Sequence, residues 1–155
     1  VPLIGPESRA TSRRGPGRRG VGPFSLRQVT LAILVVMGAA VGAPGRRAIV
    51  LQADGSAMYT IQALWTCARE NLDVTTIILS NRKYQILIGE YFAVGANPGR
   101  TAMDMLDLGD PDLDWIRIAQ GMGVEAAPTT TLEECADLMS QSFRRPGPFL
   151  IELAI

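Results

Sequence analysis

Apolar and polar residues follow one another in short blocks that predict strands alternating with helices. Apolar runs of strand length, several of them rich in β-branched residues, lie at 48–53, 74–80, 124–126 and 149–155. Apolar residues recur at helical spacing over 56–70, 84–92, 112–123 and 130–145. Apolar strands that alternate with helices are typical of a parallel sheet. The pattern therefore predicts an α/β fold, a three-layer open parallel sheet with helices on both faces.

Two helices carry further local signals. The helix at 130–145 has a capping box, formed by Thr130 with Glu133 or by Thr131 with Glu134. The helix at 56–70 places Leu64 and Trp65 on one side together with Met58 and Ile61, and large apolar residues of this kind usually lie in a core. We therefore expect Trp65, and likewise Trp115 of the later helix, to be buried.

A long apolar stretch, VTLAILVVMGAAVGA at 29–43, allows two interpretations. With arginines before it and small residues at its end, it resembles a secretory signal. It also fits a helix buried against the sheet, and its length of about fifteen residues is short for a membrane span. The family resemblance described below favours the buried helix.

Composition narrows the range of functions. The chain has 155 residues, 47% of them hydrophobic, which is enough for one domain with a real core. It has no histidine, which excludes Ser-His-Asp and Cys-His catalysis and any His-ligated zinc. Cys67 and Cys135 are far apart and fit no metal or redox spacing, so we expect both to be buried, reduced thiols in a cytoplasmic protein.

Charge is zero overall but unevenly distributed. Residues 1–25, rich in Arg, Gly and Pro, are predicted to be a disordered tail, and 26–155 the folded domain. The aspartates between 104 and 114 do not follow the order of a calcium-binding loop, so we expect a solvated loop, with Asp112 at a helix start. Zero net charge and a tail without interleaved aromatics argue against a nucleic-acid or membrane partner.

Polar residues that carry chemistry follow two of the strands. Asp54 comes after the strand at 48–53, and Asn81 comes after the strand at 74–80. In an open parallel sheet, ligands bind beyond the carboxyl ends of the strands, so neighbouring strands would bring both side chains to one edge. Carboxylate and amide oxygens suit Mg²⁺, and the N–H groups after Gly55 would meet an anion. The alternative is a simple helix N-cap made by Asp54 or Ser56.

The stretch ADGSAMYTIQALWTCARENLDVTTIILSNRKY, at 53–84, resembles the cofactor motif of thiamine-diphosphate-dependent enzymes. That motif is Gly-Asp-Gly, about two dozen residues, and Asn-Asn. The residues within the motif are most similar to those of the acetolactate synthase large-subunit and benzoylformate decarboxylase group. The similarity extends from about Gly38 to the last residue and covers the diphosphate-binding domain, without the pyrimidine-binding domain that supplies the family's activating glutamate.

The resemblance implies a ligand set. Mg²⁺ would be held by the Asp54 carboxylate, the Asn81 side-chain oxygen and the backbone carbonyl of Lys83. The cofactor's diphosphate would contact the turn at Gly55 and Ser56, with Ala57 behind it. Tyr84 would lie near the diphosphate and the mouth of the pocket.

Three departures from the family pattern stand beside this match. Ala53 replaces the first motif glycine, and its methyl group could crowd the turn. Ser80 replaces the first asparagine. The Gly-rich loop that the family has before this region is replaced by LRQVTLAILVVM.

The resemblance implies an acetolactate synthase-like enzyme that decarboxylates or joins 2-keto acids, as in branched-chain amino acid biosynthesis. Such enzymes are homo-oligomers, and the glutamate comes from another domain or subunit, so we expect this chain alone to be inactive and assign it no catalytic residue. One alternative is an inactive remnant or interaction module that keeps the fold. Another is a secreted protein whose signal is cleaved.

Overall fold

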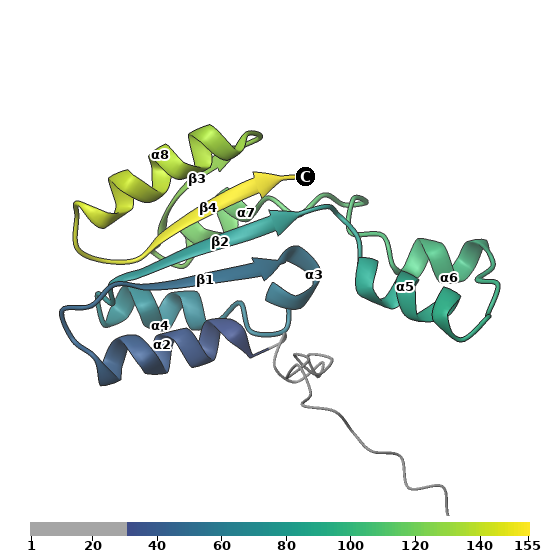
Figure 1. Ribbon diagram of the computed structural model, residues 1–155, viewed down its shortest axis with the longest axis horizontal. Helices are drawn as coiled ribbons and strands as arrows, with labels where there is room; N and C mark the ends of the chain where they lie inside the picture. Colours follow the sequence, from purple (N-terminus) through teal and green to yellow (C-terminus); the bar gives the residue numbers. More distant parts are fainter. Residues whose placement is uncertain (1–30) are drawn as a thin grey trace, which may run out of the picture.

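The structure is a computed structural model that describes residues 31–155. Its centre is a sheet of four parallel strands in the order β1-β2-β4-β3 (Figure 1). The strands are β1 (Ala48–Ala53), β2 (Val74–Ser80), β3 (Glu125–Thr129) and β4 (Phe149–Ala154). The predicted α/β class is confirmed, and β1 and β2 are neighbours. The predicted tail at 1–25 lies outside the described residues.

Three helices cover one face of the sheet. They are α2 (Ala32–Gly42), α4 (Ala63–Arg69) and α7 (Trp115–Gly121). Ile33, Leu64 and Trp115 from these helices are buried against Ile78 of β2 and Leu150 of β4. Even-numbered side chains of β2 and β4 supply this core because successive residues of a strand face opposite sides.

One helix, α8 (Leu132–Phe143), covers the other face. Its Cys135 packs with Ile77 of β2 and Ile151 of β4. The helix is capped by Thr131, whose hydroxyl accepts a hydrogen bond from the N–H of Glu134, so the second predicted capping pair is correct. The Glu134 side chain accepts from the Thr129 hydroxyl, so the box is not reciprocal. Helices on both faces give the predicted three layers.

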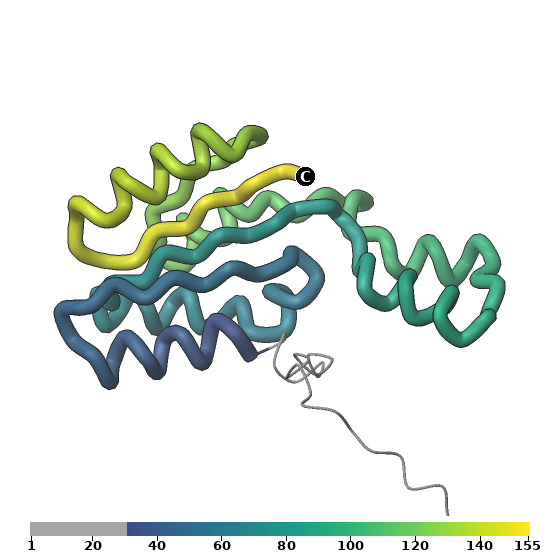
Figure 2. Tube along the Cα trace, viewed as in Figure 1, coloured from purple at the N-terminus to yellow at the C-terminus, as the bar shows by residue number. Residues whose placement is uncertain are grey.

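A pair of helices, α5 (Gln85–Ala93) and α6 (Arg100–Met105), projects beyond the carboxyl ends of the strands (Figures 1 and 2). We call this pair the arm. Its two ends are joined at a neck formed by residues 82–84 and 106–108. There the Tyr84 N–H donates to the Leu106 carbonyl and the Leu108 N–H donates to the Arg82 carbonyl. The neck therefore begins immediately after β2, next to the predicted ligands.

The prediction of one continuous helix at 56–70 is wrong. This segment is split into α3 (Asp54–Ala57) and α4, with turns between them. The break lets Leu64 and Cys67 of α4 face the sheet, while Trp65 is 52% exposed and packs under the Arg69 guanidinium at 4.9 Å. The expectation that Trp65 lies in the core is therefore wrong, whereas Trp115 is fully buried as expected.

Other boundaries also differ from the pattern. The helix predicted from Asp112 begins at Trp115, because the Asp114 carboxylate caps it by accepting from the Arg117 N–H. The third strand is longer than predicted. The acidic run is exposed as expected, but α6, which sequence reasoning missed, occupies its beginning.

The apolar stretch at 29–43 forms α2 over its described part. Ile33 and Ala40 are buried against the sheet side, which agrees with the buried-helix interpretation, although Val35 and Val41 are largely exposed. Within residues 31–155, the structure has no helix long and apolar enough to cross a membrane.

Both cysteines are free and buried, as predicted. Burial raises the pKa of the Cys67 thiol to about 11 and raises the pKa of Cys135 as well. Because the thiolate is the reactive form, neither side chain is suited to nucleophilic chemistry.

Candidate functional site

The ends of β1 and β2 bring Asp54 and the turn after β2 together. In the register of the two strands, Ala53 pairs with Leu79, so the segments that follow β1 and β2 leave the sheet at the same edge. Asp54 begins α3 and is only 1% exposed. Its side chain reaches across to the turn that contains Asn81 and Lys83, since Oδ2 accepts a hydrogen bond of 2.6 Å from the Arg82 N–H.

The Asp54 carboxylate is held by backbone donors alone. Besides the bond from Arg82, its Oδ1 accepts from the Gly55 N–H at 2.7 Å. Among residues 31–155, no Lys or Arg side chain forms an ion pair with it. A buried carboxylate is costly unless a cation or further donors balance it, and both oxygens keep accepting capacity. This environment fits a metal ligand.

The turn after β2 offers two more oxygen ligands. Asn81 Oδ1 accepts from the Lys83 N–H at 3.0 Å, which fixes the orientation of the amide. Lys83 lies opposite Asp107 in an antiparallel pair across the neck. The two hydrogen bonds of this pair are made by the residues on either side, Arg82 and Tyr84, and not by Lys83 itself. In such a pair the residue's own carbonyl points away from the opposite chain. The Lys83 carbonyl is therefore directed away from the neck and free of it.

The N-cap alternative does not describe this geometry. Helix α3 begins at Asp54 itself, its N-cap position is Ala53, and no side chain caps it. The described part of the chain has no group of three or more His, Cys, Asp or Glu side chains that could hold a metal ion. A cation at Asp54 would thus take one carboxylate, one amide oxygen and one carbonyl, and leave its other positions to the oxygens of a ligand, as Mg²⁺ commonly does.

The predicted diphosphate turn has its side chains engaged within the chain. The Ser56 hydroxyl donates to the Ala53 carbonyl and accepts from the Gln52 side-chain amide. The Ala57 methyl is buried in the core beside Ile33 and Trp115. Ser56 and Ala57 could therefore contact an anion only through their backbone N–H groups. These groups lie at the start of α3, where no carbonyl of a preceding helical turn is present to accept from them.

Tyr84 packs directly on the turn. A Cβ built at Gly55 would lie 2.6 Å from its Cδ1 and 2.9 Å from its Cε1, so only glycine allows this approach. Burial, with smaller effects of the charges of Tyr59 and Asp54, raises the pKa of Tyr84. The ordinary pKa of tyrosine is already about 10, so the hydroxyl is protonated at neutral pH and can donate a hydrogen bond.

We predict that Gly55→Ala destabilises the protein by about 1–3 kcal/mol, the usual cost of overpacking, because Tyr84 must move. Gly89→Ala is the control, since nothing lies within 4 Å of the added Cβ in α5. It should stabilise by up to about 1 kcal/mol through helix propensity. Urea unfolding followed by circular dichroism measures both. Equal effects of the two variants would contradict the close packing.

The two motif departures are accommodated by the fold. Ala53 is exposed and extended, with φ −75° and ψ 149°, so its backbone does not require glycine and no crowding within the chain arises. Ser80 is buried at the end of β2, where its carbonyl accepts from the Ile155 N–H. Neither substitution removes a predicted ligand.

Sequence reasoning missed two residues near this edge. Arg82 donates its N–H to Asp54 and forms an ion pair with Asp112 at 3.0 Å. Glu152 lies in β4, and burial raises its pKa, Asp112 and Asp114 raise it further, and Ser80 and Arg82 lower it. Glu152 could have been found from the sequence, because it is an acidic residue within an otherwise apolar strand. No sequence pattern indicated Arg82, because its bond to Asp54 is made by its backbone N–H and not by its side chain.

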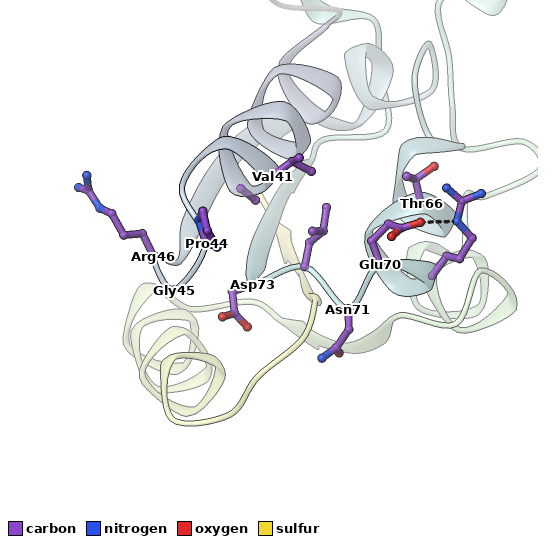
Figure 3. Close-up of a pocket in the computed structure, with 11 residues that line it drawn as sticks. Val41, Pro44, Gly45, Arg46, Thr66, Glu70, Asn71 and Asp73 are labelled. Atoms are coloured by element: carbon purple, nitrogen blue, oxygen red, sulfur yellow. Dashed lines mark hydrogen bonds and ion pairs between the residues drawn. The ribbon is translucent and has the colours of Figure 1, made fainter.

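A hollow of about 560 Å³ lies at the opposite, amino end of the strands (Figure 3). It is lined by residues that precede β1 and β2, among them Pro44, Arg46 and Asp73. Figure 3 shows Arg46 directed away from it and Glu70 paired with Arg69. This hollow is separate from the Asp54 edge and includes none of the predicted ligands.

Comparison with known proteins identifies the family of the chain. The family model described as "Thiamine pyrophosphate enzyme, C-terminal TPP binding domain" matches residues 16–153. The chain belongs to this family. The match begins earlier than Gly38, where the resemblance in the sequence begins.

Individual relatives support the same family. IlvX of Mycobacterium tuberculosis, named as an acetolactate synthase large subunit, is 51% identical over 125 residues, which are 79% of this chain and 24% of the relative. Benzoylformate decarboxylase of Pseudomonas aeruginosa is 36% identical over 76% of this chain and 21% of the relative. The solved thiamine diphosphate-dependent 4-hydroxybenzoylformate decarboxylase of Rhodococcus jostii RHA1 matches with a TM-score of 0.69 and 32% identity, covering 81% of this chain and 23% of that one. The chain thus spans about a fifth to a quarter of the length of these relatives.

Proposed function

We propose that this thiamine-diphosphate-binding domain holds its cofactor through Mg²⁺ bound by Asp54, Asn81 and the Lys83 carbonyl. The observation that carries the proposal is the buried Asp54 carboxylate, which has backbone donors and no ion-pair partner in the described chain. It lies one hydrogen bond from the turn that presents the other two oxygens. A cation there would balance the buried charge and attract a diphosphate.

The remaining predicted residues have distinct parts in this proposal. The backbone N–H groups of Gly55, Ser56 and Ala57 would contact the diphosphate, and the small size of Gly55 allows Tyr84 to close the turn from one side. Tyr84 can donate a hydrogen bond through its protonated hydroxyl. None of these residues takes part in bond breaking, so the domain contributes binding and orientation.

The parent activity that we propose is acetolactate synthase-like, with 2-keto acids as substrates. When bound, thiamine diphosphate supplies the carbanion and electron sink needed for decarboxylation or carbon–carbon bond formation. We assign the activating glutamate to a pyrimidine-binding domain or subunit acting in trans, within a homo-oligomer. We expect this chain alone to be inactive. A cytoplasmic location and a role in branched-chain amino acid biosynthesis stay predictions.

An inactive remnant that keeps the fold is the second candidate. Exposed apolar side chains favour an interaction role, since large uncovered apolar surface usually marks a contact with another protein. They include Ile49 and Leu51 on the open side of β1 and Phe92 and Val94 on the arm. Cofactor binding separates this candidate from the first.

The test is a calorimetric titration of thiamine diphosphate into the purified chain with Mg²⁺ and with EDTA. We expect saturable binding only with Mg²⁺, because the cation links the carboxylate to the diphosphate. Thiamine, which lacks the diphosphate, is the matched ligand control and should bind much more weakly. A folded chain that binds neither ligand under either condition would refute the proposal and favour the remnant.

A further inference from the structure

Arg82 is held in an unusual backbone conformation by contacts on three sides. Its φ of +57° lies in the left-handed region of the backbone, which residues other than glycine rarely adopt. Its N–H donates to Asp54 Oδ2 at 2.6 Å, and its carbonyl accepts from the Leu108 N–H at 2.8 Å. Its guanidinium pairs with Asp112 at 3.0 Å. One residue therefore joins the buried carboxylate, the neck of the arm and the loop before α7.

The left-handed conformation sets the direction of the Arg82 carbonyl, and of Lys83 after it, relative to the N–H that donates to Asp54. If Arg82 relaxed to the ordinary helical or extended region, its N–H could not keep the bond to Asp54 while its carbonyl kept the bond from the Leu108 N–H. The conformation is unfavourable by itself, so the contacts around it must maintain it. The guanidinium forms the ion pair with Asp112, and it also lowers the pKa of Glu152 by its charge.

We propose that Arg82 is a positioning residue for the cation site and that Asp112 acts through it. This inference rests on the proposed function for its effect on ligand binding. In the proposal, Arg82 orients the Asp54 carboxylate and the turn that carries Asn81 and Lys83. Asp112 holds the guanidinium, and thereby the turn, against the loop before α7.

The effect of Asp112 is expected to be modest, because the pair is half exposed, with side-chain exposures of 59% for Arg82 and 51% for Asp112. Exposed ion pairs contribute little individually and are screened by salt. We expect Asp112→Asn to weaken Mg²⁺-dependent binding of thiamine diphosphate about two- to fivefold at low salt, with a smaller loss at high salt. Arg82→Ala should weaken it similarly, and the double variant should add little.

Asp104→Asn is the matched control. It removes another exposed Arg–Asp pair, Arg100 with Asp104 at 3.6 Å, within α6 and away from Asp54. Arg82→Lys keeps the positive charge and should restore most of the affinity that Arg82→Ala loses. A purely structural role would not produce this charge rescue together with a salt dependence.

A second readout does not need the cofactor. Amide hydrogen exchange at Arg82 in the ligand-free chain reports the bond to Asp54, and it should be faster in Asp112→Asn than in wild type or Asp104→Asn. If wild type fails to bind thiamine diphosphate, the proposed function fails, and the exchange result still decides the positioning role. Unchanged exchange at Arg82 in Asp112→Asn would overturn the inference. Tighter binding by that variant would also overturn it, because the guanidinium would then be a diphosphate ligand that Asp112 restrains.

Discussion

Asp54→Asn is expected to abolish Mg²⁺-dependent binding of thiamine diphosphate, with a loss of affinity of at least about 100-fold. Changes to groups that only support a metal ligand commonly cost about 10- to 100-fold, so loss of the charged ligand itself costs more. Asparagine has nearly the same shape, but it carries no charge. Its amide nitrogen would also face one of the N–H groups of Gly55 and Arg82, which now donate to the carboxylate.

Calorimetric titration measures this loss, and thermal unfolding with and without Mg²⁺ provides an independent check. A ligand that binds the folded state raises its melting temperature, so Mg²⁺ with cofactor should stabilise wild type but not Asp54→Asn. Asp104→Asn, at an exposed position of α6, should behave as wild type. If Asp54→Asn bound within a few-fold of wild type, Asp54 would not be the cation ligand.

Arg47→Ala is expected to lower the free energy of unfolding by about 2–4 kcal/mol, a large share of the roughly 5–15 kcal/mol typical of a domain. The Arg47 side chain is only 13% exposed. It donates to the Thr75 hydroxyl at 3.1 Å, to the Gly147 carbonyl at 3.2 Å and to the Arg145 carbonyl, and it pairs with Asp73 at 3.4 Å. It thus ties the starts of β1 and β2 to the turn between α8 and β4.

Removing Arg47 leaves the Asp73 carboxylate with its hydrogen bond from the Gly147 N–H but without its ion pair, and it leaves the Gly147 and Arg145 carbonyls without this donor. The adjacent Arg46→Ala is the control, because Arg46 is exposed and directed away from the hollow in Figure 3. Its effect should stay within about 0.5 kcal/mol. Urea unfolding monitored by circular dichroism distinguishes the two, and equal stability of both variants would contradict the structural role of Arg47.

Local pattern and motif were sufficient for most of the fold. The central strand β2, Val74–Ser80, is β-branched and apolar, and it is buried on both faces as such a run requires. The Thr131 cap is readable from residues three positions apart. Both features can be predicted from sequence, because a cap depends on residues a few positions apart and a buried strand is marked by its own apolar residues.

The break between α3 and α4 illustrates where local pattern failed. Residues 56–70 have apolar spacing for one helix, yet the chain interrupts it so that Ala57 and Leu64 both reach the core beside Trp115. The orientation of Trp65 toward solvent follows from that break. Packing against distant elements outweighed the local preference, and no short window of sequence contains that information.

By itself, the sequence determined the α/β class, the parallel strands and the two positions, Asp54 and Asn81, that directly follow strands. The structure showed that these two strands are neighbours. The sequence could do this much because alternation of apolar runs and the motif residues are local properties. Only the tertiary structure decided that Asp54 is buried without an ion-pair partner in the described chain, that Gly55 lies against Tyr84, and that Arg82 joins Asp54 to Asp112. Those relations join residues far apart in sequence, and they exist only once the strands have paired and the neck has closed beside them.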